Sequence, residues 1–292
     1  MAPRISVIVP NHNYGLFLDR FLGSLAAQAF PAREVEVWLV DDASTDDSLA
    51  RAEAWRARSA WAGLEILRLP RTRWPGLVRN EGLRRARGEL LLCCDPDDWL
   101  EPEFLSRTVA ALDADPEKHL AFTDYWEDSP QGMRLMSLPE FRPAILRTQN
   151  ICHTTTLLRR EVWEASRGFR ANTTYEDWDF WVQAAQNGFS AVHVAEPLLH
   201  YCLHKANFSH TAVKADGLSK AAIVRNNPRF FPPEVRAWAA AHIRREFWAP
   251  AFSRGVIPRA EDIRALLDLY AQRRGQAHAG AIAPAGQPRS SA

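Results

Sequence analysis

The sequence predicts an α/β fold built around a mainly parallel sheet that is flanked by helices. Apolar runs at residues 5–9, 34–40, 64–69 and 89–94 alternate with segments whose apolar residues recur at helical spacing. The first and fourth runs are almost entirely apolar, as expected of strands that are buried on both faces. Regular alternation of strand and helix is typical of a parallel sheet with helices on its faces.

Turn and cap residues between the runs set the order of the elements. The first strand ends at Pro10 and a polar turn, after which Phe17, Phe21 and Leu25 recur at helical spacing. Asp41-Asp42 closes the second strand, and Gly88 ends the helix before the fourth. The expected order is strand 5–9, helix 17–29, strand 34–40, helix 44–59, strand 64–69, helix 76–86, strand 89–94, helix 104–114 and strand 120–125.

The pattern becomes less regular beyond Asp128. We expect a loop-rich excursion at 129–150, a strand at 152–158, a helix at 175–187, and one or two short strands at 191–203. From about Asp216 the chain reads as helical, with Pro232-Pro233 and Pro258 marking helix starts. The tail 275–292 is rich in Ala, Gly, Pro and Ser, which predicts disorder.

Composition and charge exclude several classes of protein. The chain has 292 residues, with 36 Lys+Arg against 35 Asp+Glu, so its net charge of +1 argues against a general nucleic-acid binder. No stretch approaches the roughly 18 uninterrupted apolar residues of a membrane span. The four cysteines form no CxxC pair, which argues against a zinc site or a disulfide framework and favours a cytoplasmic location.

Carboxylates gather where three predicted strands end. Asp41-Asp42 follow the second strand, and Asp95, Asp97 and Asp98 follow the fourth. In a parallel sheet these strand ends share one edge, where ligands bind. Crowded carboxylates favour a divalent cation that bridges the protein to a diphosphate, although caps and turns would use the same residues. No phosphate-binding GxxxxGK[ST] or GxGxxG follows a strand, which argues against P-loop and dinucleotide-binding proteins.

Five segments in order resemble the family 2 glycosyltransferases, which have the GT-A fold. They are ISVIVPNHNYGLFLDRFLGSLAAQAF, VWLVDDASTDDS with Ala43 where Gly is usual, GLVRNEGLRRARGELLLCCDPDDWL with a DxD motif, YEDWDFWVQAAQNG, and YCLHKANFSH with Cys202 where Arg is usual. The resemblance covers residues 5 to about 205 and implies a Rossmann-like sheet with a C-terminal helical extension.

The resemblance also implies roles for residues on the donor side. The segment Pro10, Asn11, His12 and Asn13 would pack around the nucleotide base, with His12 where Tyr is usual. Asp42 would hydrogen-bond the base, and Asp41 would support the same loop. Arg79 would reach the nucleotide or the acidic loop, with a plain surface salt bridge as the alternative.

Further roles are implied for the metal and the chemistry. Asp95 would approach the ribose, and Asp97 would bind a divalent cation, Mn²⁺ or Mg²⁺. Asp98 would steady the loop or a metal-bound water, and His204 would lie near the diphosphate or the metal. Asp177, preceded by Glu176, would be the catalytic base.

The implied activity is metal-dependent, inverting transfer of a hexosyl group from a nucleotide-diphosphate sugar, with UDP as the default nucleotide. The acceptor would be a hydroxyl of a bacterial surface polysaccharide, a lipid-linked saccharide or a protein glycan. Two alternatives remain open: a sugar-phosphate nucleotidyltransferase, and a non-catalytic partner protein that binds nucleotide sugars. The first usually opens with a glycine-rich loop, where this chain has PNHNYG.

These expectations divide the chain into a glycosyltransferase domain at 1–210, a helical extension at 211–274 and the tail. Within the first, 1–128 would bind the nucleotide and 129–210 would face the acceptor. Aromatic residues mixed with Arg in 229–256 suit a helix that lies peripherally on the inner face of the membrane, or one that packs over the catalytic domain. Spacing alone does not decide between these two.

Overall fold

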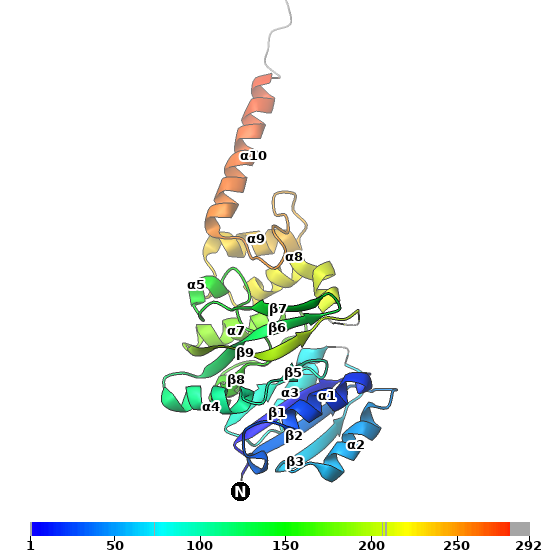
Figure 1. Ribbon diagram of the computed structural model, residues 1–292. Coiled ribbons are helices and arrows are strands. Elements are labelled where there is room, and N and C mark those ends of the chain that lie inside the picture. The colour runs from blue at the N-terminus through cyan, green and yellow to red at the C-terminus, as the bar shows by residue number, and fades with distance from the viewer. Residues whose placement is uncertain (1, 73, 206, 208, 281–292) are drawn as a thin grey trace, which may run out of the picture.

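The computed structural model describes residues 2–280 except 73, 206 and 208, and gives only the backbone for 209–213 and 273–280. Its centre is a nine-stranded sheet in the order β3-β2-β1-β4-β8-β6-β9-β5, with β7 paired to β6 (Figure 1). The C-terminal helices are stacked beyond the sheet, at the end of the molecule opposite the N-terminus.

The first half of the sheet is parallel, as the sequence predicts. Strand β1 pairs in parallel with both β2 and β4, and β2 pairs in parallel with β3. The elements of this half are β1 (Ile5–Asn11), α1 (Gly15–Ala26), the 3-10 helix η1 (Ala32–Glu34), β2 (Val35–Asp41), α2 (Ser48–Arg58), β3 (Gly63–Arg68), α3 (Pro75–Leu83), β4 (Leu90–Cys93), β5 (Trp99–Leu100) and α4 (Phe104–Ala114).

The second half of the sheet is mixed. β6 pairs in parallel with β9 but antiparallel with β7 and β8, and β8 joins it to β4 antiparallel. The elements are β6 (Leu120–Ser129), β7 (Gly132–Met136), α5 (Pro143–Leu146), β8 (Leu157–Arg159), α6 (Arg160–Glu164), α7 (Glu176–Gln186) and β9 (Ala191–Cys202).

Two expectations for this half were wrong. The excursion at 129–150 contains a hairpin, because β6 continues to Ser129 and β7 returns beside it, and it also contains α5. The strand expected at 152–158 is confined to Leu157–Arg159, since the residues before it form a loop against the cleft described below.

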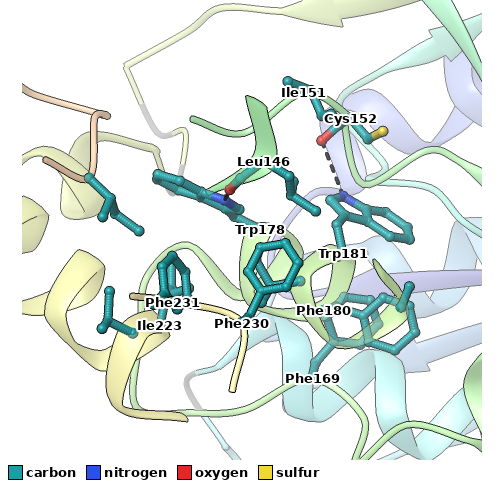
Figure 2. Close-up of a cluster of buried hydrophobic side chains, with 14 of the residues drawn as sticks. Leu146, Ile151, Cys152, Phe169, Trp178, Phe180, Trp181, Ile223, Phe230 and Phe231 are labelled. Carbon is teal, nitrogen blue, oxygen red and sulfur yellow. Dashed lines mark hydrogen bonds between the residues drawn. The ribbon is translucent and has the colours of Figure 1, made fainter. Parts of the chain in front are cut away.

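Two hydrophobic cores cover the two faces of the sheet. Side chains of β1 alternate between them: Val7 and Val9 pack on the face covered by α1, α2 and α4, while Ile8 packs on the face covered by α3 and α7. Burial on both faces explains why the strands read as continuous apolar runs. Trp178 and Trp181 are fully buried in the second core, where their indole nitrogens donate to the carbonyls of Leu146 and Cys152 (Figure 2).

The C-terminal extension consists of α8 (Ser209–Asn226), α9 (Pro233–Ile243) and α10 (Ala260–Gly280). α8 and α9 lie between the sheet and α10, which projects away from the body (Figure 1). The backbone is helical to Gly280, and the rest of the expected disordered tail, 281–292, lies outside the described residues. Within the described part of the chain, none of the helices combines the length and apolar character that crossing a membrane requires.

Candidate active site

The strand ends that the sequence singles out meet at one cleft. Asn11 at the end of β1 is paired with Asp41 at the end of β2, and the acidic loop 95–98 follows the neighbouring β4. The cleft has a volume of about 750 Å³ and is also lined by α3, the 150–155 loop and the start of α7. It therefore lies at the carboxyl edge of the parallel half of the sheet, where ligands bind in open α/β folds.

Most residues expected at the site line this cleft. They are Pro10, Asn11, His12, Asn13, Asp42, Arg79, Asp95, Asp97 and Asp177. Asp41 and His204 are not among the lining residues, but each lies within hydrogen-bond distance of one of them, Asn11 and Asp97 respectively. Asp41 accepts hydrogen bonds from Asn11 Nδ2 at 2.9 Å and from the Ser44 amide at 3.0 Å, so it holds two donor-side loops together.

The donor-side loops are fixed by an unusual backbone as well as by hydrogen bonds. Asn13 and Ala43 both have φ of +59°, in the left-handed region. Asn13 Oδ1 accepts from the Thr45 amide at 2.7 Å, which ties the turn after β1 to the turn after β2. A left-handed residue at position 43 explains why glycine would suit this position better than alanine.

Asp42 is buried, and its carboxylate is engaged by the loop that follows β3. It forms an ion pair with Arg71 and accepts a hydrogen bond from the Thr72 amide at 2.5 Å. The His12 ring nitrogen Nδ1 lies 2.8 Å from the Asp42 carbonyl oxygen, which fixes the orientation of the imidazole at the cleft wall. Arg71 and Asp42 both line the cleft.

The acidic loop after β4 concentrates buried carboxyl groups. Asp97 is 6% exposed, and its Oδ2 lies 2.9 Å from His204 Nε2 and 3.2 Å from Asn207 Nδ2. Burial and the charge of Asp95 raise the pKa of Asp97 to about 6, although the hydrogen bond with His204 acts in the opposite direction. Burial and the charge of Asp97 likewise raise the pKa of Asp98 well above its usual range. Burial is the larger cause of both shifts, and the neighbouring carboxylates add to it.

Arg20 and Cys202 hold this loop from outside the cleft. Arg20 donates to the Asp97 carbonyl oxygen and to Cys202 Sγ, each at 2.9 Å. The Cys202 amide donates to Asp98 Oδ1 at 3.0 Å. Asp98 therefore fixes the loop to β9, which agrees with one of its two expected roles.

The described residues contain no cluster of three or more His, Cys, Asp or Glu arranged to hold a metal. Asp97 and His204 alone offer one carboxylate and one imidazole. This donor set fits a Mg²⁺ or Mn²⁺ ion whose remaining ligands are substrate phosphates and water, since such ions are usually held by one or two protein carboxylates.

Arg79 is buried rather than part of a surface salt bridge. Its guanidinium donates to Asp95 at 2.6 Å and to Glu176 at 2.9 Å, and its Nε has no hydrogen-bond partner. Gly82, one turn further along α3, lets this helix pack closely on β1, because a Cβ there would lie 2.7 Å from a methyl of Ile8. Arg79 thus connects the acidic loop to the first turn of α7.

Asp177 lies in the first turn of α7, as its position in the sequence predicts. Its Oδ2 accepts from Asn150 Nδ2 at 2.8 Å, and its Oδ1 lies 2.7 Å from the Trp178 amide. Burial raises the pKa of Asp177 despite these hydrogen bonds. Burial also raises the pKa of Glu176 to about 7, against the effect of Arg79. A partly desolvated carboxylate beside a cleft is a suitable proton acceptor.

Sequence reasoning missed several residues at this site. Asn150 contacts Asp177, Asn207 contacts Asp97, and Arg71 contacts Asp42. Each comes from a loop without periodic pattern. Gly255 also lines the cleft, so the helical extension reaches the site that we expected within 1–210.

Comparison with known proteins now identifies the family. Residues 6–167 match the family model described as Glycosyl transferase family 2. The chain belongs to this family.

Among relatives of this family 2 glycosyltransferase, the poly(ribitol-phosphate) beta-N-acetylglucosaminyltransferase TarS of Staphylococcus aureus is 39% identical over 111 residues, 38% of this chain and 19% of TarS. The O-antigen biosynthesis protein RfbC of Myxococcus xanthus is 28% identical over 225 residues, 76% of this chain and 17% of RfbC. The chain thus spans less than a fifth of each of these two relatives.

Solved structures confirm the fold of this family 2 glycosyltransferase. TarS residues 1–349 in complex with UDP-GlcNAc superpose with a TM-score of 0.64 at 24% identity, covering 86% of this chain and 73% of that one. The mannosyltransferase PcManGT of Pyrobaculum calidifontis, in complex with GDP-Man and Mn²⁺, gives 0.62 at 21% identity and covers 96% of this chain and 80% of that one. The expected GT-A architecture is therefore confirmed.

Proposed function

We propose that this chain is an inverting glycosyltransferase of surface polysaccharide or glycoconjugate synthesis, with a UDP-sugar as donor. The observation that carries the proposal is one cleft at the carboxyl edge of the sheet that is lined both by the acidic loop with Asp97 and by Asp177. Family membership supports the reaction class, and the names of TarS and RfbC support the kind of product. The donor complex of TarS supports UDP as the nucleotide.

On this proposal, residues 1–128 supply the donor side. The turn at 10–13 packs around the base, and Asp42 accepts hydrogen bonds from it once Arg71 moves aside. Asp97 and His204 would hold Mn²⁺ or Mg²⁺, which when bound stabilises negative charge on the leaving diphosphate. The Mn²⁺ complex of PcManGT supports a divalent cation in this fold.

Asp177 accepts the proton in the proposed reaction. The acceptor oxygen attacks the anomeric carbon and gives its proton to Asp177, while the bond between that carbon and the diphosphate oxygen breaks and its electron pair leaves with the diphosphate. Asn150 holds the Asp177 carboxylate toward the cleft. Attack in one step from the opposite face inverts the anomeric configuration.

The helical extension packs against the catalytic part in this proposal. Within residues 229–256, all of which the structure describes, Phe230, Phe231 and Trp238 are buried in the core, and Phe247 is 67% exposed. A helix that lies on a membrane needs a continuous apolar face. The burial of these aromatic residues therefore favours packing over peripheral membrane contact.

A thermal-shift panel of UDP-GlcNAc, UDP-glucose, dTDP-glucose and GDP-mannose, each with and without Mn²⁺, tests the donor side. A ligand at about 100 times its Kd adds about 2.7 kcal/mol to the free energy of unfolding, which raises Tm by roughly 5–10 °C in a chain of this size. We expect a Mn²⁺-dependent shift with a UDP-sugar. Asp97→Ala should abolish it, and Asp268→Ala on α10 is the matched control.

Transfer itself is tested with the donor that the panel selects. Transfer to an added saccharide acceptor should release the nucleoside diphosphate. The anomeric configuration of the glycosylated product, read by NMR, should be opposite to that of the donor. A product with retained configuration would refute the single-step mechanism. No shift and no turnover with any donor would refute the proposed function.

A further inference from the structure

Helix α8 presents a buried polar face toward the start of α7. Asp216, Ser219 and Lys220 lie at positions i, i+3 and i+4, which share one side of a helix. They are 9%, 3% and 0% exposed. Buried charged groups are costly unless their hydrogen bonds are satisfied, so a polar face in this place calls for a specific explanation.

Lys220 has all three of its donor positions occupied. Its Nζ lies 2.7 Å from Asp216 Oδ2 and donates to the carbonyl oxygens of Ala251 and Ser253, each at 2.7 Å. An ammonium group has three protons to donate, so the requirement is met. Lys220 thereby fixes the segment 251–253, which precedes Gly255 at the cleft.

Asp216 carries the connection from Lys220 to the cleft wall. Its Oδ1 accepts from the Tyr175 hydroxyl at 2.7 Å and from the Gly255 amide at 2.8 Å. Tyr175 and Gly255 both line the cleft, whereas Asp216 and Lys220 do not. Hydrogen bonds to this carboxylate from Lys220, Gly255 and Tyr175 outweigh the effect of burial, and the pKa of Asp216 is lowered. It is therefore ionised at neutral pH.

The same face of α8 holds the residues directly before α7. Ser219 Oγ lies 2.7 Å from Thr174 Oγ1 and accepts from the Thr174 amide at 3.1 Å, and the Thr173 hydroxyl donates to the Ser219 carbonyl at 3.1 Å. Residues 173–175 are thus bonded to α8 at three successive positions. Asp177 follows two residues later, so its backbone position depends on this attachment.

We propose that Asp216, Ser219 and Lys220 are positioning residues that fix the acceptor side of the cleft. They hold Tyr175 and Gly255 in place and, through residues 173–175, set where the first turn of α7 presents Asp177. The helical extension is then part of the active site rather than an appendage to it. This inference rests on the proposed function, because it takes Asp177 as the proton acceptor.

A satisfied polar network suits positioning better than an apolar contact does. Apolar packing would hold α7 and α8 together but would tolerate small sliding, whereas directed hydrogen bonds allow one arrangement. A displacement of about 1 Å at a reacting group can cost 10²-fold in rate. The hydrogen bonds of the network go to residues 173–175 and to the segment 251–255. We therefore expect the network to act on turnover more than on donor binding.

Tyr175→Phe tests the connection with the smallest change, since it removes only the hydroxyl. With the donor chosen by the thermal-shift panel and Mn²⁺, we expect kcat for nucleotide diphosphate release to fall by roughly 10- to 100-fold. The KM for the donor should stay within about twofold. Lys220→Met should give the same pattern, and Ser219→Ala should give a smaller loss that is again confined to kcat.

A general loss of stability is distinguished by Val235→Ala, which removes buried apolar volume from α9 and leaves the hydrogen-bonding groups of Asp216, Ser219 and Lys220 in place. Its Tm should fall while its kcat per folded molecule stays near wild type. Lys220→Met that fails to fold leaves Tyr175→Phe and Ser219→Ala as the deciding pair. If Tyr175→Phe and Ser219→Ala both keep wild-type kcat while Asp177→Asn is inactive, the positioning inference is overturned and the proposed function stands. A loss in Tyr175→Phe with wild-type kcat in Ser219→Ala and in folded Lys220→Met also overturns it, because Tyr175 then acts directly. Absence of turnover by the wild type overturns the proposed function and this inference with it.

Discussion

Asn150→Ala should move the acid limb of the activity profile to higher pH. Asn150 Nδ2 donates to Asp177 Oδ2 at 2.8 Å, and this hydrogen bond lowers the pKa of Asp177 against the effect of burial. A group that stabilises the charged form of a carboxyl lowers its pKa, so removal of that group raises it. The base is then protonated over a wider range, and activity is lost at a higher pH than in the wild type.

The size of the shift follows from the strength and exposure of this hydrogen bond. A hydrogen bond to a charged group contributes about 1.5–3 kcal/mol, and about 1.4 kcal/mol corresponds to one pH unit. Asn150 is exposed, so water replaces part of the lost interaction. We therefore expect the midpoint of the acid limb to rise by roughly 0.5–1 pH unit.

The assay is nucleotide diphosphate release as a function of pH, read as kcat/KM between pH 4 and 8. Asn172→Ala is the matched control, because Asn172 is an exposed asparagine near α7 that pairs with Asn226 and not with Asp177. Its profile should coincide with that of the wild type. An acid limb for Asn150→Ala that stays in place or moves to lower pH would show that Asp177 is not the titrating base.

Three further predictions test other parts of the site. Asp177→Asn should lower kcat by about 10²–10⁴-fold with little change in donor affinity, measured by turnover and by titration; lost donor binding with normal turnover would make Asp177 a binding residue. Asp97→Ala should keep Tm without ligand near wild type and abolish Mn²⁺-dependent turnover; activity within a few-fold of wild type at saturating donor would remove Asp97 from the metal site. The full chain should stay in the supernatant with anionic vesicles at low salt; sedimentation that Phe247→Ser abolishes would instead support membrane contact.

The sequence predicts the parallel half of the fold because burial on both faces leaves a direct pattern. Strands such as β1 and β4 are buried and mostly apolar, and helix α4 lies at the predicted positions. β7 has no such pattern, since Gly132–Met136 is largely exposed and is joined to β6 by backbone pairing and by the ion pair of Arg134 with Glu127. α5 has four residues and β8 three, too few for a periodic signal.

The candidate site likewise contains residues that the sequence could predict and contacts that it could not. Residues at strand ends or in a helix's first turn, such as Asp97 and Asp177, are placed by local sequence and by the family resemblance. Contacts between distant segments leave no local signal. Asn150 and Asp177 are 27 residues apart, Tyr175 and Asp216 are 41 apart, and Arg79 and Glu176 are 97 apart. Only the tertiary packing of these segments brings them together.

The charge of the cleft explains why the proposed donor would need a cation. Arg71 and Arg79 are its lining arginines among the described residues, and each is already paired with carboxylates of the site. Six carboxyl groups line the same space: Asp42, Asp95, Asp97, Asp98, Glu176 and Asp177. A diphosphate would therefore enter a field of its own sign. A divalent ion held by Asp97 would supply the positive charge that a bound diphosphate needs, whereas Arg79 is already paired with Asp95 and Glu176. Asp97→Ala should consequently abolish donor binding together with its dependence on Mn²⁺, because the cation would supply the charge that binds the diphosphate.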